Sequence, residues 1–200
     1  MESIPIKGHT AYNELRMGIA YNKIIVLGNS GSGKSTLAQK IGEKLSLPVH
    51  HLDFHFFSAN WKQPDDEEWR QKITQFLSED KWVIEGGVNN LESRVSACDL
   101  VIYLDFPLYF CLYRVIKRYF HFKKTETPFL PKGCDNKLTF HFLKYIFTFR
   151  SVRHPLIMET LMKYQGLRQT LILKTLQDIE DFEIIFLNNL IKKKNPLEEI

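Results

Sequence analysis

The most constraining feature of the chain is the segment Gly28 to Ser35, which reads Gly-Asn-Ser-Gly-Ser-Gly-Lys-Ser. It matches the G-x-x-x-x-G-K-S phosphate-binding loop, in which glycines permit a tight turn and backbone N–H groups surround phosphate oxygens. Lys34 would place a positive charge beside the β- and γ-phosphates, and the hydroxyl of Ser35 could bind Mg²⁺. The residues expected to contact the bound polyphosphate are Gly28, Asn29, Ser30, Gly31, Ser32, Gly33, Lys34, Ser35 and Thr36.

The segments around the loop have the order that this motif requires. Residues 23–27 form a short apolar run, which is typical of a buried parallel strand. Residues 36–45 follow with apolar positions at helical spacing, and the N-terminus of a helix favours a polyphosphate. The alternative is a glycine-rich turn that binds nothing, and the strand, the Lys-Ser pair and the helix together argue against it.

Alternating strands and helices predict an α/β fold of the P-loop NTPase type. Such alternation implies a three-layer sandwich, with a five-stranded parallel sheet covered by helices on both faces. In these sheets ligands bind beyond the carboxyl ends of the strands. The expected strands are 23–27, 47–53, 82–85, 100–104 and 171–174, and the expected helices are 36–45, 64–78, 108–122, 139–149, 155–165 and 178–189.

Length and composition favour one globular domain. We expect a single domain over residues 23–190, an N-terminal extension over 1–22 with Met17 as an alternative start, and a polar C-terminal tail over 191–200. No apolar run approaches the roughly 18 residues that cross a bilayer, and no signal-peptide core is visible. Three cysteines without C-x-x-C spacing argue against a disulfide framework and a zinc site. We therefore predict a cytoplasmic monomer or homodimer without membrane attachment.

Acidic residues close three of the expected strands. Asp53 lies on the same rim as the loop, where its carboxylate could accept a proton from a substrate hydroxyl or hold Mg²⁺, or simply cap a turn. Glu85 precedes two glycines and could contact Mg²⁺, contact the substrate or order a turn. Asp105 precedes Phe-Pro and ranks below both. We expect Ser35, Asp53 and Glu85 to hold the metal.

Arg114 and Arg118 are four residues apart, so they share one face of the expected helix. Two guanidinium groups on one face suit phosphate oxygens and the charge that develops during transfer, although a surface pair is the alternative. Together with Lys34 and Asp53, they form the predicted catalytic set.

Further arginines and a group of histidines are weaker candidates. The second arginine pair is Arg150 with Arg153, followed by Arg94. His50, His51 and His55 surround Asp53, but their spacing fits no standard zinc signature, so Mg²⁺ on oxygen ligands is the simpler expectation.

Charge is concentrated in one third of the chain. The net charge is +4, yet residues 105–170 contain twelve Lys or Arg against four Asp or Glu, interleaved with many aromatic residues. Such a segment suits a phosphate-rich ligand, either a nucleotide or a nucleic acid. A solvated basic face over an aromatic core is the simpler account of most of these residues.

An ordered set of motifs resembles the small P-loop kinase-like proteins known as DNA topology modulation proteins, which are relatives of adenylate and shikimate kinases. The resemblance covers residues 23–182, most of the chain. The motifs that carry it are Gly28 to Ala38, Leu47 to Asp53, Trp61 with Glu67-Glu68-Trp69-Arg70, Trp82 to Gly86, Leu104 to Pro107, Arg114 to Arg118, Gly133-Cys134 and Phe149-Arg150.

The resemblance implies a P-loop kinase fold that binds ATP and Mg²⁺, with a helical lid insertion at about residues 119–138 and the arginine pair at the base of the lid. One position departs from the pattern, because the family more often has Asp-Gly-Asn where this chain has Glu85-Gly86-Gly87. The acid is one methylene longer and the amide is lost, so the departure concerns the role of Glu85.

Two classes of function follow. The first is an ATP-dependent phosphotransferase that passes the γ-phosphoryl group to a small hydroxylated or nucleotide-type acceptor. The second is a nucleotide-gated regulator that affects DNA topology, although no helix-turn-helix or zinc-finger signature is present. A plain ATPase or GTPase switch is a third, and the absence of an N-K-x-D motif disfavours GTP. The kinase interpretation accounts for more of the residues.

Overall fold

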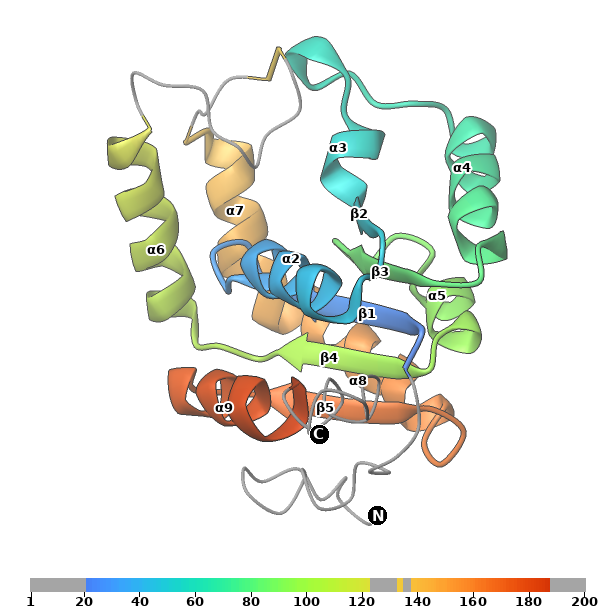
Figure 1. Ribbon diagram of the computed structural model, residues 1–200. Helices are drawn as coiled ribbons and strands as arrows, with labels where there is room; N and C mark the ends of the chain where they lie inside the picture. Colours follow the sequence, from blue (N-terminus) through green and yellow to red (C-terminus); the bar gives the residue numbers. More distant parts are fainter. Residues whose placement is uncertain (1–20, 123–132, 135–137, 188–200) are drawn as a thin grey trace.

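The computed structural model describes residues 21–122, 133–134 and 138–187. Its centre is a sheet in which all neighbouring strands are parallel, in the order β2-β3-β1-β4-β5 (Figure 1). The strands are β1 (Lys23–Gly28), β2 (Val49–His51), β3 (Trp82–Glu85), β4 (Leu100–Leu104) and β5 (Gln169–Leu173). The predicted α/β fold with a five-stranded parallel sheet is confirmed.

Helices connect successive strands and cover both faces of the sheet. The α-helices are α2 (Lys34–Leu45), α3 (Leu52–Phe56), α4 (Asp66–Ser78), α5 (Leu91–Ala97), α6 (Leu108–His121), α7 (Phe140–Thr148), α8 (His154–Lys163) and α9 (Leu176–Asp181). Three short elements complete them: the 3₁₀ turn η1 (Ala59–Trp61) and the π-helical segments η2 (Phe149–Arg153) and η3 (Phe182–Leu187).

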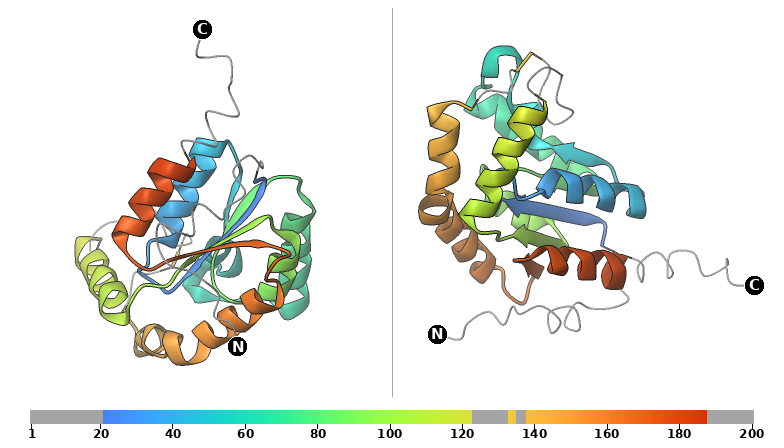
Figure 2. Two further views of the ribbon diagram at one scale, coloured as in Figure 1. Left: turned by 90° about the horizontal axis from the view of Figure 1, so that it is seen from below. Right: turned by 90° about the vertical axis from the view of Figure 1, so that its left-hand side faces the viewer.

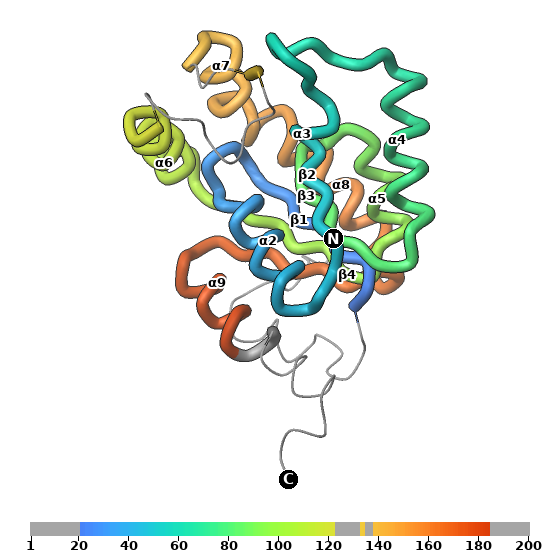
Figure 3. Tube along the Cα trace, turned by 45° about the horizontal axis from the view of Figure 1, so that its top comes forward, coloured from blue at the N-terminus to red at the C-terminus, as the bar shows by residue number. Residues whose placement is uncertain are grey.

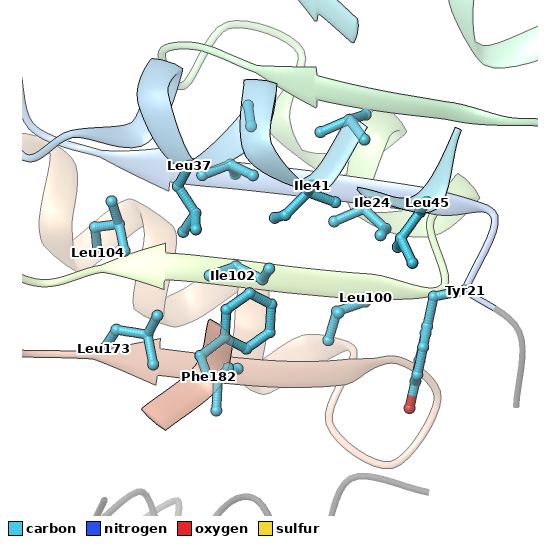
Figure 4. Close-up of a cluster of buried hydrophobic side chains, with 14 of the residues drawn as sticks. Tyr21, Ile24, Leu37, Ile41, Leu45, Leu100, Ile102, Leu104, Leu173 and Phe182 are labelled. Atoms are coloured by element: carbon cyan, nitrogen blue, oxygen red, sulfur yellow. The ribbon is translucent and has the colours of Figure 1, made fainter. Parts of the chain in front are cut away.

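Alternation along β1 divides the core into two clusters. Ile24 and Val26 belong to the cluster under α2 and η3, whereas Ile25 and Leu27 belong to the cluster under α4, α5 and α8. This is the pattern of a strand that is buried on both faces, since successive side chains point to opposite sides. Figure 2 shows α2 and α9 on one side of the sheet and α8 on the other, and Figure 4 shows the first cluster from within.

Local sequence explains several helix boundaries. The side chain of Asp65 accepts a hydrogen bond of 2.7 Å from the backbone N–H of Glu68 and so caps α4, whose first turn is acidic. Gly33 precedes α2 with a φ of +96°, and the helix begins at Lys34, two residues before the predicted start. Lys34 is therefore already part of the helix.

The structure differs from the expected elements in three places. The strand expected over 47–53 ends at His51, because Leu52 buries its side chain and starts the short helix α3. Helix α5 was not predicted, although Leu91 and Val95 are four apart and both are buried. The helices expected at 139–149 and 155–165 form an almost continuous rod, because η2 joins α7 to α8.

Two residues of the predicted N-terminal extension contact the sheet region. Tyr21 is 4% exposed and packs in the core, and the backbone N–H of Asn22 donates to Asp99 at 2.9 Å. Met17, the rest of the predicted extension, the C-terminal tail and most of the predicted lid lie outside the described residues.

Two described residues of the predicted lid region, Gly133 and Cys134, contact the loop around η1, which is distant in the sequence. The carbonyl oxygen of Gly133 accepts a hydrogen bond of 3.0 Å from the N–H of Asn60, and the Cys134 thiol donates to the carbonyl of Ser58 at 3.2 Å.

Among the residues that the structure describes, no helix is long and apolar enough to cross a membrane.

Candidate active site

A large cavity lies beside the phosphate-binding loop, with a volume of about 1010 Å³. Residues of α2, α3, α4, α6 and α7 and of the segments after β1 and β3 line it. Figure 3 shows the turn from β1 into α2 between α6 and α7 on one side and α3 on the other. The position at the carboxyl ends of parallel strands is the one expected for a ligand site in this class of fold.

The backbone of the loop is fixed by its glycines and by contacts with α6. Gly31 has a φ of +85°, and a Cβ at this position would overlap the carbonyl oxygen of Cys111. Arg114 donates a hydrogen bond of 3.3 Å from Nη1 to the carbonyl of Ser32. Because both contacts involve α6, the conformation of the loop depends on where this helix packs.

A second contact joins the loop to α7. Asn29 is 6% exposed, and its Nδ2 donates to the carbonyl of Ile146 at 3.1 Å, while its Oδ1 accepts from the N–H of Ser30 at 2.8 Å. Gly28, Asn29 and Ser32, which the sequence predicted to contact the polyphosphate, do not line the cavity. The loop residues that line the cavity are Ser30, Gly31, Gly33, Lys34, Ser35 and Thr36.

Glu85 stands at the centre of the polar contacts. Its Oε1 accepts a hydrogen bond of 3.0 Å from Ser35 and lies 2.9 Å from Nδ1 of His51, and its Oε2 lies 3.8 Å from Nζ of Lys34. Burial alone would raise the pKa of this carboxyl, but Lys34, His51 and Ser35 outweigh burial, so the pKa is lowered. Glu85 is therefore a buried carboxylate that is held ionised, and its β3 position agrees with the prediction.

Asp53 lies in the first turn of α3, two residues beyond the end of β2, rather than at a strand end. Asp53 is exposed to the space of the cavity, where other lining residues surround it. The loss of water around its carboxyl raises the pKa of Asp53, Lys34 opposes the rise, and Glu85 adds to it. For Lys34, burial lowers the pKa, but Glu85 and Asp53 outweigh burial and the pKa is raised. The lysine stays charged between two acids.

Arg114 and Arg118 both line the cavity, as their shared helix face predicted. Burial lowers the pKa of Arg118, and Asp53 counteracts this effect. Arg114 contacts the loop directly and also lies over the ring of Phe110, with 5.4 Å between Cζ and the ring centroid. The structure thus brings together Lys34, Asp53 and both arginines around one space.

The weaker arginine pair is separated by the structure. Arg150 forms an ion pair with Asp105, which also lies 3.6 Å from Nδ1 of His154 and does not line the cavity. Arg153 does line the cavity, and its Cζ lies 4.0 Å above the ring of Tyr145. The low rank of Asp105 is therefore consistent with its position, whereas Arg153 is placed more favourably than its sequence suggested.

Arg94 is fully buried in α5 and donates a hydrogen bond to the carbonyl of Gly87, in the segment that follows Glu85. Its Nε and Nη1 have no hydrogen-bond partner among the described residues, and burial lowers its pKa to about 10. The residue does not line the cavity, so its contribution is to hold the Gly87 backbone.

The histidines do not form one group. His50 pairs with Glu79 at 2.9 Å and stacks on Phe76, with ring centroids 4.2 Å apart, and His55 packs against the same phenylalanine. Only His51 reaches Glu85. Within the described residues, no set of three or more His, Cys, Asp or Glu side chains is arranged to hold a metal ion.

The donor set nevertheless fits an Mg²⁺ ion that arrives with a nucleotide. Oε2 of Glu85 is buried without a hydrogen-bond partner in the described part of the chain, and the Ser35 hydroxyl lies beside the other oxygen. Hard oxygen ligands of this kind suit Mg²⁺, which is usually bound by one or two protein groups, phosphates and water. Ser35, Glu85 and Asp53 are the residues that would hold it.

Sequence reasoning missed the aromatic residues that line the cavity between residues 54 and 69. These residues are Phe54, Phe56, Phe57, Trp61 and Trp69, which we call the aromatic wall. Three phenylalanines within the four residues after Asp53, namely Phe54, Phe56 and Phe57, were the available signal. The sequence analysis placed a strand end at Asp53 and assigned no role to these rings.

Comparisons with known proteins agree with the fold. No family model and no curated protein matches the chain. Among solved structures, a shikimate kinase from Acinetobacter baumannii in complex with shikimate is similar, with a TM-score of 0.55 and 14% identity over 90% of this chain and 96% of that one. A gluconokinase from Sinorhizobium meliloti has a TM-score of 0.49 and 18% identity over 88% and 95%. The resemblance to DNA topology modulation proteins stays a prediction, and the likeness to the shikimate kinase shows that this chain has the fold of the P-loop kinases.

Proposed function

We propose that the protein is an ATP-dependent phosphotransferase that acts on a small acceptor carrying a hydroxyl group. The observation that carries this proposal is the placement of Asp53. Its carboxylate shares one cavity with Lys34 of the phosphate-binding loop and is close enough to it for each charge to affect the other's pKa. A simple ATPase would not need an enclosed acid and a large additional space on this side of the loop.

The residues divide the reaction between them. Lys34, Arg114 and Arg118 stabilise negative charge on the transferred group and its leaving oxygens, since preorganised cations act most strongly in an enclosed site. Asp53 accepts the proton of the acceptor hydroxyl. At the same time the hydroxyl oxygen of the acceptor bonds to the γ-phosphorus of ATP, and the bond from this phosphorus to the β,γ-bridging oxygen breaks, so that ADP leaves. Glu85 keeps Ser35, His51 and Lys34 in place. A bound Mg²⁺ would supply further charge neutralisation of the phosphates.

The first experiment measures ADP release by the full chain with ATP and Mg²⁺, with and without candidate acceptors. The panel contains nucleosides, nucleoside monophosphates, sugars, sugar acids and other small alcohols, and Lys34→Ala is the control. An acceptor that raises the rate of ADP release in the wild type, and not in the variant, identifies a kinase. Tight ATP binding without stimulation by any acceptor contradicts the proposal.

The described cations of the basic third bear on the DNA-regulator alternative. In the basic third, Arg150 pairs with Asp105, Lys163 pairs with Glu92, and Arg168 donates to the carbonyl of Ser96. These cations are therefore engaged within the chain. Binding of duplex DNA that persists at about 150 mM salt, with a steep salt dependence, would favour the alternative over the kinase.

A further inference from the structure

The acceptor side of the cavity differs in chemistry from the phosphate side. Between residues 54 and 69 six side chains line the cavity, the five of the aromatic wall and Gln63, and none carries a charge. The cations that line the cavity come from α2, α6 and η2, which are Lys34, Arg114, Lys117, Arg118 and Arg153. One wall is thus uncharged and mostly aromatic, whereas the cations lie on the other walls together with Phe122, Phe142 and Tyr145.

The rings of the aromatic wall are packed edge to face. The centroid of Phe56 lies 4.8 Å from that of Trp69 at an interplanar angle of 77°, and Phe57 lies 5.2 Å from Trp61 at 72°. Such geometry is favourable for aromatic pairs and fixes the ring orientations. A preformed surface of this kind can bind another flat ring without first reorganising.

Trp61 is held in an unusual conformation within this wall. Asn60 and Trp61 are consecutive non-glycine residues with φ values of +61° and +60°, a region that bulky residues rarely occupy. Trp61 is nevertheless 41% exposed and faces the cavity. The Trp61 ring packs against Phe57 and still leaves a large area open toward the cavity, and strained backbone at such a position is a reason to look for a ligand contact.

Trp69 supplies a second, independent observation. The residue is 6% exposed and lines the cavity, and its indole N–H has no hydrogen-bond partner among the residues that the structure describes. An unpaired buried donor is costly unless a ligand or water satisfies it.

The aromatic wall and the proposed base belong to one short element. Asp53, Phe54 and Phe56 are residues of α3, and Phe57 follows it directly. Lys34, which is expected to contact the β- and γ-phosphates, is coupled to Asp53, so the γ-phosphate end of the nucleotide faces α3. A ligand on the aromatic wall therefore lies on the acceptor side of the transferred group and not on the nucleoside side of ATP.

We infer that the acceptor is an alcohol with a flat aromatic ring, which binds against the aromatic wall while its hydroxyl group reaches Asp53. This inference rests on the proposed phosphotransferase activity and names its substrate class. It separates this chain from enzymes whose acceptors are ring-free sugar acids, because such acceptors would leave five aromatic side chains facing water or a hydroxylated surface.

The test is calorimetric titration of the full chain, saturated with Mg²⁺ and a non-hydrolysable ATP analogue. The aromatic probes are adenosine, thymidine and pyridoxine, and the probes without an aromatic ring are gluconate, shikimate and glycerol. We expect an aromatic probe to bind more tightly than any of the others. In Trp61→Ala its affinity should fall by about 10–100-fold, as for ring stacking elsewhere, and Trp61→Phe should stay within about threefold.

Control variants show whether the loss of affinity comes from the aromatic wall. Tyr109 is 76% exposed and does not line the cavity, so Tyr109→Ala should change no affinity. Affinity for the ATP analogue should be the same in all variants, which also shows that they are folded. Should Trp61→Ala not fold, Phe57→Leu removes a ring while it keeps an apolar side chain, and the same loss is expected.

The inference is overturned if a probe without an aromatic ring binds most tightly or if no probe binds. It is also overturned if Trp61→Ala binds the aromatic probe with unchanged affinity, or if this variant loses affinity for the ATP analogue instead. These results differ from a failure of the proposed function. A chain that transfers phosphate to gluconate in a Lys34-dependent reaction is a kinase with another acceptor class, whereas ring binding without any Lys34-dependent transfer removes the kinase and leaves the ring site.

Discussion

The two ends of the cavity are built in different ways. The phosphate end is a continuous segment, residues 28–36, whose shape follows from glycine conformations and whose groups are mostly backbone N–H donors. The acceptor end combines side chains from α3, η1 and α4, which follow one another in the sequence, with side chains from the distant helix α7. The first can be recognised from spacing alone, while the second depends on how the helices pack. Changes at the two ends should therefore affect different measured quantities.

The largest effect is expected at the boundary between the two ends. Asp53→Asn removes the proton acceptor but keeps its shape, so kcat should fall by about 10²–10⁴-fold, the usual contribution of a general base. Affinity for an ATP analogue measured without Mg²⁺ should not weaken, because one negative charge near Lys34 is lost. Single-turnover phosphate transfer is the measurement. The matched control is Asp105→Asn, a strand-end acid outside the cavity, and an equal loss in this control would contradict the assignment.

At the phosphate end, Gly31→Ala should disturb the loop. Its φ of +85° and the carbonyl of Cys111 leave no room for a methyl group, so we expect the free energy of unfolding to fall by about 2 kcal/mol, or more if α6 must shift. Binding of the ATP analogue should weaken strongly. Gly166→Ala is the control, since its φ of +79° imposes similar strain with no atom within 4 Å of the added Cβ. Thermal unfolding and titration of both variants would show whether the clash or the strain dominates.

The pH dependence of kcat/KM should reflect the acceptor end. Asp53 must be ionised to accept a proton, and enclosure raises its pKa above the ordinary value of 3.8. Activity should therefore fall, as the pH is lowered, at a higher pH than for an exposed aspartate. The lowered pKa of Glu85 means that this residue stays ionised over the same range, and that its contribution to stability is lost only below its ordinary value of 4.5. Arg114→Lys should leave the acid limb in place. An acid limb at or below pH 3.8 would contradict the prediction.

The smallest effect is expected behind the cavity. Arg94→Met removes a buried charge with two unpaired N–H groups but also its hydrogen bond to Gly87. Because these changes oppose each other, the free energy of unfolding should change by less than about 2 kcal/mol. KM for the acceptor should rise by a few fold as the Gly87 segment loosens, while KM for ATP stays constant. Rescue of the acceptor KM in Arg94→Lys would support positioning through the hydrogen bond, and a large drop in stability would contradict this account.

Most of the fold and the phosphate end could be predicted from the sequence. Short apolar runs indicated the five strands and apolar residues at helical spacing indicated most helices, while the loop motif, the strand-end position of Glu85 and the spacing of the arginine pair pointed to residues that the structure brings together. The position of Asp53 in α3 could not be read from the sequence, because the short segment from Leu47 to Asp53 fits a strand as well as a strand followed by a helix start. The partnership of His51 with Glu85 and the orientation of Arg94 depend on tertiary packing, which local patterns do not contain.

The attachment of the phosphate-binding loop to two helices has a practical consequence. Gly31 packs on the backbone of α6, Arg114 of that helix donates to Ser32, and Asn29 donates to Ile146 of α7. Residues 122–139 connect the end of α6 to the beginning of α7 in the sequence. Shortening, lengthening or exchanging this connection would therefore affect both helices that support the loop. Chimeras designed to alter acceptor choice through this stretch should accordingly be screened for nucleotide affinity first.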